Sequence, residues 1–204
     1  MLLARMIKSL SKSSNFSLKK ILLKNKNKRY TALHYAVKKN LPLKIIKFLV
    51  ESKSVLNEKD DEKDDNSPLH VACKSNTSFE IIRYLIENKC DLNKKNIYGN
   101  LPLHYLLIRP SSHLETIKFL VDQKTDLNLL NNNLDGPLHI LCKSKSIPIE
   151  KIEYFVEKNI DLNHKNIDDC DPFQLASNNE YISTDIIHYL KIHSICNLET
   201  GIFF

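Results

Sequence analysis

A short motif containing a proline and a histidine returns along this chain at an almost constant interval. Its clearest copy is Ser67-Pro68-Leu69-His70, and the histidine position recurs at residues 34, 70, 104 and 139, and as glutamine at 174. The successive intervals are therefore 36, 34, 35 and 35 residues. A fixed period of this length predicts an array of stacked repeats.

Two further markers keep the same period. Each motif starts one expected helix, because proline lacks an N–H and fits the first helical turn, while Thr31 or Ser67 just before it can cap the free amides. A second apolar helix follows, and one such helix pair cannot bury its apolar stripe without a neighbour. The second helices centre on residues 46–49, 82–85, 117–120, 152–155 and 187–190, and an asparagine closes each unit at 57, 93, 128, 163 and 197.

The copies Thr31-Ala32-Leu33-His34 and Ser67-Pro68-Leu69-His70 resemble the Thr-Pro-Leu-His-x-Ala signature of the ankyrin repeat. The resemblance runs from about Lys28 to Asn197. It implies an all-α helical repeat solenoid with short β-hairpin or turn loops, built of about five repeats. The expected repeats are residues 30–64, 65–98, 99–133, 134–168 and 169–197, with an N-terminal cap at 1–29 and an apolar tail at 198–204.

The chain has only three glycines, although ankyrin repeats usually place glycine where a left-handed residue ends each helix. Asparagine adopts that conformation readily and lysine poorly. We therefore expect a folded array of limited stability. The substituting residues are Asn40 and Asn76 after first helices, Lys53, Lys89, Lys124 and Asn159 after second helices, and Leu134 in a turn.

The five cysteines are expected to be buried free thiols. The chain has no Cys-x-x-Cys pair, and Cys73, Cys90 and Cys142 stand where ankyrin repeats have a small alanine. Free thiols indicate a reducing compartment, so we expect a cytoplasmic protein, with a nuclear location left open. No stretch approaches the roughly 18–20 apolar residues that a membrane-spanning helix needs.

The N-terminal segment is strongly basic. Residues 1–50 contain 13 lysines and arginines and no acid, whereas the rest of the chain holds 17 basic and 24 acidic side chains. We interpret residues 1–29 as a degenerate capping repeat. The alternatives are a mitochondrial presequence and a basic cap that binds RNA or an anionic lipid surface.

No pattern of catalytic, cofactor-binding or metal-binding residues is recognised. The motif histidines occupy the same position in successive repeats, so neighbouring histidines are expected to lie about one repeat apart. That distance is too large for two of them to bind one metal ion. In ankyrin repeats this histidine bonds the backbone of the adjacent hairpin. The acidic run Glu58–Asp65 is expected to be a solvated loop, and Pro110 is expected to end its helix early.

The resemblance implies a non-catalytic protein-protein interaction scaffold or adaptor, acting as a monomer and binding through its loop tips and first helices. The expected partner carries an acidic segment, gripped around Ile97, Tyr98 and Arg109. An alternative is a substrate-recruiting subunit of a larger enzyme complex, or a host-directed effector. The expected contact residues are Tyr30, Lys38, Lys39, Asn66, Lys74, Ser75, Ile97, Tyr98, Asn100, Ile108, Arg109, Asn133, Asp135, Lys143 and Ser144.

Overall fold

The computed structural model describes residues 31–51, 56–60, 64–75, 77–109 and 111–200, with side chains as far as residue 195. These residues form ten helices, α3 to α12, and no strand. The expected all-α repeat fold is therefore confirmed. The expected cap at residues 1–29, with Tyr30, lies outside the described residues.

The chain divides into two compact units, Met1–Cys90 (unit one) and Asp91–Phe204 (unit two). Unit one contains two helix pairs, in which α3 packs on α4 and α5 packs on α6. The pairs also stack, because α3 contacts α5 and α4 contacts α6. The helices are α3 (Ala32–Lys38), α4 (Leu43–Glu51), α5 (Pro68–Lys74) and α6 (Phe79–Glu87).

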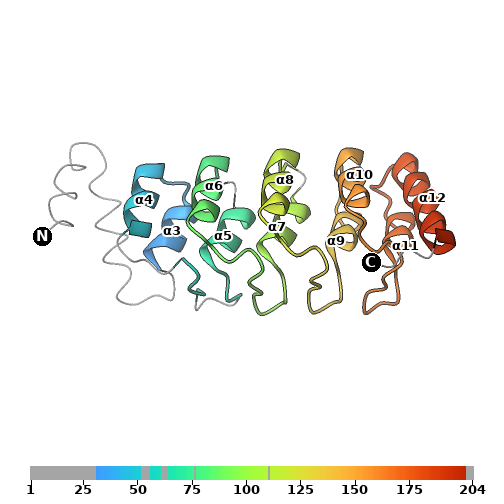
Figure 1. Cartoon of the computed structure of the whole chain (residues 1–204), viewed down its shortest axis with the longest axis horizontal. Helices are drawn as coiled ribbons and strands as arrows, with labels where there is room; N and C mark the ends of the chain where they lie inside the picture. Colours follow the sequence, from blue (N-terminus) through green and yellow to red (C-terminus); the bar gives the residue numbers. More distant parts are fainter. Residues whose placement is uncertain (1–30, 52–55, 61–63, 76, 110, 201–204) are drawn as a thin grey trace, which may run out of the picture. The chain divides into compact units, whose positions relative to one another are not determined.

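Unit two repeats the same arrangement over three helix pairs. The first helices stack in the order α7, α9, α11, and each packs against its own second helix. The loops that lead from one pair to the next lie on the same side of these helices (Figure 1). The helices are α7 (Pro102–Ile108), α8 (Leu114–Asp122), α9 (Pro137–Cys142), α10 (Ile149–Glu157), α11 (Pro172–Ser177) and α12 (Thr184–Thr200).

The helix starts follow the predicted chemistry. Proline occupies the first turn of α5, α7, α9 and α11, where no N–H partner is needed. The hydroxyl oxygen of Thr31 caps α3 and that of Ser67 caps α5, each accepting from the backbone N–H three residues later.

The core is formed by one leucine from each motif and by the apolar stripe of each second helix. Leu33, Leu69, Leu103 and Leu138 are all at most 1% exposed. The second helices keep the predicted phase, since α6, α8, α10 and α12 begin at residues 79, 114, 149 and 184. In α12 Ile186 and Leu190 are buried, while Ile187 is only half-buried.

The predicted left-handed residues are confirmed where the structure describes them. Asn40, Lys89, Lys124 and Asn159 have φ of 48°, 67°, 70° and 55°, and Leu134 has 56°. Positive φ costs a side-chain-bearing residue roughly 1–2 kcal/mol, so these positions lower the stability of the fold. Lys53 and Asn76 lie outside the described residues.

Two local expectations were wrong. The helix α7 is not shortened before Pro110, because it has seven residues, as α3 and α5 do. The acidic run is not solvated throughout, since Asp60 is 1% exposed and its carboxylate accepts from the backbone N–H of Asn66 at 3.0 Å. Asp60 therefore shapes its loop.

Among the described residues, no helix has the length and apolar character that crossing a membrane requires.

Candidate functional site

In unit two each loop between helix pairs carries a five-residue turn, here called a tip. Each tip begins with a buried asparagine whose side-chain oxygen accepts from the backbone N–H groups of the second and fourth residues after it, at 2.8 to 3.1 Å. The asparagine N–H in turn donates to the carbonyl oxygen of the last tip residue. These side-chain-to-backbone bonds fix the turn. The tips are residues 96–100, 131–135 and 166–170.

Backbone bonds also join consecutive tips of unit two. The N–H of Asn132 donates to the carbonyl oxygen of Tyr98 at 2.9 Å, and the N–H of Ile167 donates to that of Asn133 at 3.0 Å. The Nδ2 of Asn132 adds a bond to the carbonyl oxygen of Ile97 at 2.8 Å. The tips of unit two are therefore one hydrogen-bonded array.

Gly99 is required where the first two tips meet. Its φ is +71°, and a Cβ there would lie 2.7 Å from the backbone nitrogen of Asn132. A side chain at residue 99 would thus be strained by its conformation and would also push the next tip away.

The motif histidines hold the helix starts to the following loop. In unit one, His34 Nε2 lies 2.9 Å from the carbonyl oxygen of Asn66, and in unit two His139 Nε2 lies 3.0 Å from that of His164. Burial lowers the pKa of His34 to about 4 and also lowers the pKa of His139. Both imidazole groups are thus mainly neutral at pH 7.

Several large apolar side chains of unit two are exposed on or beside the tips. Ile97 and Tyr98 are 46% and 49% exposed, and Ile108 at the end of α7 is 47% exposed. Leu134 and Ile167 on the later tips are exposed as well. Exposed aromatic and aliphatic side chains on a fixed backbone are typical of interface residues.

The backbone beside Ile108 is held by two polar side chains. The carbonyl oxygen of Arg109 accepts from the hydroxyl of Ser112 at 2.8 Å and from Lys151 Nζ at 3.5 Å. Lys151 is 3% exposed, and its Nζ lies 3.0 Å from Ser112 Oγ. Burial, and then the charge of Arg109, lower the pKa of Lys151.

Three residues expected on the binding face are buried, and that expectation was wrong for them. Asn66, Asp135 and Ser144 are 3%, 2% and 9% exposed, because the neighbouring loop or helix covers them. Asp135 accepts from Asn166 Nδ2 at 3.0 Å, which ties it to the next tip.

Two of the expected basic contact residues are paired with acids. Lys143 Nζ lies 2.7 Å from Asp135, and Lys74 Nζ lies 2.7 Å from Asp64. The expected polar residue Asn100 accepts from Asn131 Nδ2 at 3.1 Å. The remaining expected residues in the described chain are at least partly exposed: Lys38, Lys39, Ser75 and Asn133.

Other exposed residues were not predicted from the sequence. Ile167 lies two periods after Ile97, so the repeat spacing alone could have indicated it. Tyr181, which is 54% exposed, and Lys145 border a shallow hollow of about 480 Å³ at the ends of α9 and α11. No periodic signal marks Tyr181, because it lies in the irregular connection before α12.

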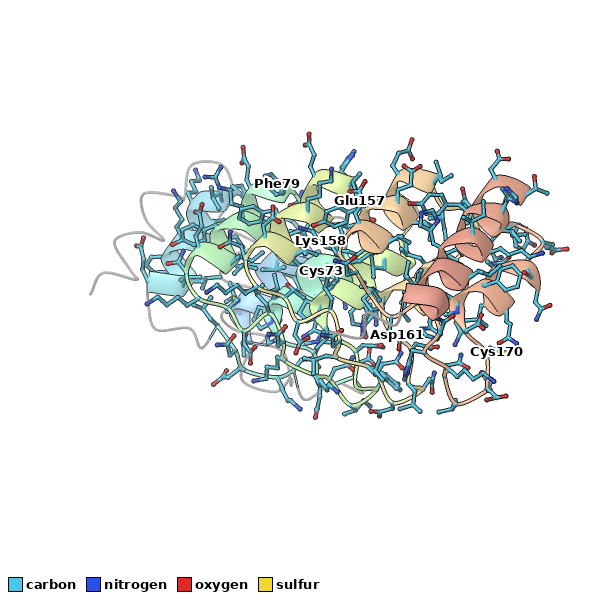
Figure 2. The ribbon with its side chains drawn as sticks, turned by 45° about the vertical axis from the view of Figure 1, so that its right-hand side comes forward. Cys73, Phe79, Glu157, Lys158, Asp161 and Cys170 are labelled. Atoms are coloured by element: carbon cyan, nitrogen blue, oxygen red, sulfur yellow. The ribbon has the colours of Figure 1, made fainter. Side chains whose placement is uncertain are left out.

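Among the described residues, no group of three or more His, Cys, Asp and Glu side chains is placed to hold a metal ion. Cys73, Cys90 and Cys142 are buried and outside disulfides, as expected. Burial raises the pKa of the Cys142 thiol to about 12, so it is protonated and packs as a small apolar group. Cys73 lies in α5 and Cys170 on the last tip (Figure 2).

Comparison with known protein families agrees with this geometry. The family model described as ankyrin repeats, in three copies, matches residues 44–131. Comparison with curated proteins finds no match. The same helix pairs and tips continue past the matched residues, through α9–α10 and α11–α12. Ankyrin repeats are generally protein-binding modules without catalytic activity. The chain therefore contains ankyrin repeats, over residues 44–131.

Proposed function

We propose that this protein is a non-catalytic scaffold or adaptor, and that unit two binds a protein partner around Ile97, Tyr98, Ile108 and Arg109. The observation that carries the proposal is the exposure of Ile97 and Tyr98 on a tip whose backbone is bonded internally and to the next tip. A rigid aromatic anchor loses little conformational entropy on binding, and such residues dominate interface energies.

The chemistry of the face favours a partner segment with apolar side chains. Ile97, Tyr98 and Ile108 supply an apolar contact. Lys143 already has Asp135 as its counter-ion. We assign the contact with an acidic partner residue to Arg109 because it directly follows the exposed Ile108 in the chain. One carboxylate opposite Arg109 would set orientation and specificity, while the apolar anchors would supply most of the affinity.

In this proposal the protein acts as a monomer in the cytoplasm and uses no cofactor. The buried thiols of Cys73 and Cys142 support a reducing compartment. A scaffold of this kind also serves as the substrate-recruiting subunit of an enzyme complex or as a host-directed effector, and the nature of the captured partner would distinguish these roles.

The test is affinity purification of the intact chain with mass spectrometry, comparing the wild type with a Tyr98→Ala, Arg109→Ala double variant. We expect recovery of the principal partners to fall by about tenfold or more, since each tenfold loss corresponds to about 1.4 kcal/mol. The matched control is Ile192→Ala, which removes a similarly exposed apolar side chain from α12. Retention of every partner by the double variant, with unchanged thermal stability, would overturn the proposal.

A further inference from the structure

A lysine of one second helix lies over a tyrosine ring of the next second helix at two places in the chain. Lys47 Nζ on α4 lies 5.5 Å from the ring centroid of Tyr84 on α6. Lys118 Nζ on α8 lies 5.3 Å from the ring centroid of Tyr154 on α10. Both distances are within the range in which a cation is attracted to the face of an aromatic ring.

The last two second helices, α10 and α12, break this pattern. Tyr189 on α12 stands one period after Tyr154, but Glu153 on α10 stands one period after Lys118. Glu157 follows four residues later, on the same face of α10, and α10 contacts α12. Burial, and then the charges of Glu153 and Glu157, raise the pKa of Tyr189. Two carboxylates therefore face this tyrosine, where a lysine lies in the earlier repeats.

One side of the Tyr189 ring already has a neighbour. His193 packs against it with the ring centroids 4.1 Å apart. On α10 the ring of Tyr154 has two cationic neighbours, Lys118 Nζ at 5.3 Å and Lys158 Nζ at 5.4 Å. His193 stands one period after Lys158. The place beside Tyr189 that corresponds to Lys118 is therefore the one left for a ligand.

The two glutamates have no counter-ion in the part of the chain that the structure describes. Glu153 is half-buried and Glu157 is exposed, and neither forms an ion pair there. The adjacent Lys158, labelled with Glu157 in Figure 2, lies near Tyr154 and forms an ion pair of 4.0 Å with Asp122. Like charges four residues apart on a helix destabilise it, and a bound cation would relieve this repulsion.

The corresponding positions of the earlier second helices show which group is missing. In α4, α6 and α8 a basic residue precedes an acidic residue by four positions, and in α6 the two form an ion pair of 2.7 Å. In α10 both positions are acidic, so the cation of this pair is absent from the helix. The earlier pairs are Lys47 with Glu51, Arg83 with Glu87, and Lys118 with Asp122.

We propose that Glu153, Glu157 and Tyr189 bind an arginine side chain from a basic segment of a partner protein. A guanidinium group is planar, so it stacks on the tyrosine ring while its N–H groups donate to the carboxylates. Two negative charges beside an aromatic face select a cation and disfavour nucleic acids and anionic lipids. Ile192 stands one period after Glu157, so it faces away from α10 and is not part of this surface. The inference does not depend on the proposed function of the tips.

The first experiment titrates the full-length chain at pH 7.5 with a glycine-serine peptide that contains two arginines. The backbone amide signals of Glu153, Glu157 and Tyr189 are followed by NMR. We expect saturable shifts with a dissociation constant of about 1 mM or below, and at least about tenfold weaker binding of the same peptide with citrulline in place of arginine. Citrulline keeps the size of arginine without its charge. Absence of saturable shifts, or equal affinity for the two peptides, would overturn the proposal.

Two variants locate the site. Glu153→Lys restores the pattern of the earlier repeats, so peptide binding should weaken at least about tenfold while the melting temperature stays equal or rises. Tyr189→Leu keeps an apolar side chain without the aromatic ring and should weaken binding about threefold or more. The control Glu115→Lys makes the same charge change on α8 and should alter the affinity by less than about twofold. Unchanged binding to a folded Glu153→Lys variant would show that the arginine binds elsewhere.

A third arm identifies the source of the arginine. Residues 1–29 of this chain contain nine lysines and arginines and no acid, so a second copy could supply the cation. Sedimentation equilibrium therefore compares the intact wild type with the Glu153→Lys variant. Two monomeric proteins support a separate partner. Self-association of the wild type that Glu153→Lys abolishes would assign the surface to a second copy and overturn the proposal of a separate partner.

Discussion

Lys143 Nζ lies 2.7 Å from each carboxylate oxygen of Asp135. The Asp135 side chain is 2% exposed, while that of Lys143 is 35% exposed, and Asp135 also accepts from Asn166 Nδ2 at 3.0 Å. One carboxylate therefore joins the tip 131–135, the end of α9 and the following tip. This ion pair contributes to the fold of unit two. Because Lys143 already has a counter-ion, its charge is less available for an ion pair with an acidic partner.

Replacing Lys143 with methionine should destabilise the protein. The change leaves the buried Asp135 carboxylate without its counter-ion. Because Lys143 is itself partly exposed, we expect a loss of about 1–3 kcal/mol, below the full cost of breaking a buried pair. The measurement is the free energy of urea unfolding at pH 7. Lys145→Met, at an exposed neighbouring site, is the control and should change it by less than about 0.5 kcal/mol. Equal values for the two variants would contradict the structural role of the pair.

The stability of the protein should decrease between pH 6.5 and pH 4 because of His34. Its pKa is lowered by burial from 6.5 to about 4, so the unfolded chain binds a proton in this range that the folded chain does not. The contribution is present above pH 6.5 and is lost progressively as pH falls to about 4, amounting to roughly 3 kcal/mol.

This pH effect is measured by urea unfolding at pH 7.0, 6.0 and 5.0, above the range in which most carboxylates titrate. A His34→Gln variant should be less stable at pH 7 but show a flatter pH dependence, since it lacks the titrating group. His113→Gln, at an exposed site, should behave like the wild type. A His34→Gln variant with the full wild-type slope would show that another group is responsible.

Substitution of Gly99 should disturb the tip array more than substitution of Gly136. Gly99→Ala introduces a side chain at φ +71°, against the backbone of Asn132, and we expect a loss of more than about 1 kcal/mol from the conformation alone. Gly136 has φ −92° and room for a Cβ after a small shift of Leu130. Gly136→Ala should therefore be nearly neutral in chemical unfolding. The opposite order of the two variants would show that the tips are not packed as described.

Glycine at the left-handed lysines should stabilise the protein. Lys89→Gly and Lys124→Gly each relieve a positive φ of about 70°, at the expense of greater freedom in the unfolded chain. We expect a net gain of about 0.5–1 kcal/mol for each. Lys118→Gly, inside α8, is the control and should cost about 1 kcal/mol. Destabilisation by both test variants would mean that these lysines make contacts that outweigh their strain.

The fold could be predicted from the residues that recur with the repeat period. The burial of the polar loop residues could not be predicted. Leu33 and Leu69 occupy the same position of a motif that recurs at the start of the first helix of each pair, so the period predicts their burial without knowledge of contacts. Asp135 resembles a solvated turn residue in the sequence, and its burial depends on Asn166 in the next repeat.

The candidate binding face could be predicted only in part, because the repeat pattern does not show contacts between neighbouring repeats. Ile97 and Tyr98 stand at tip positions that the resemblance already marked, and both are exposed. A cavity of about 210 Å³ lined by Leu130, Gly136 and His164 could not be predicted, because Leu130 and Gly136 lie in one loop and His164 lies in the next. The repeat pattern shows only which position a residue occupies within its repeat. Whether a cavity forms depends on the sizes of the side chains that neighbouring repeats bring together.

The most direct test of the account is photo-crosslinking with p-benzoylphenylalanine introduced at residue 98, compared with the same group at residue 192, in cells that express the intact protein. Tyr98 lies on the first tip of unit two and Ile192 on α12, and the two side chains are similarly exposed. We predict that residue 98 yields a discrete crosslinked protein, which a fivefold excess of unlabelled chain competes away, and that residue 192 does not. Equal crosslinking at the two sites, or none at residue 98, would contradict a protein-binding role for the tips.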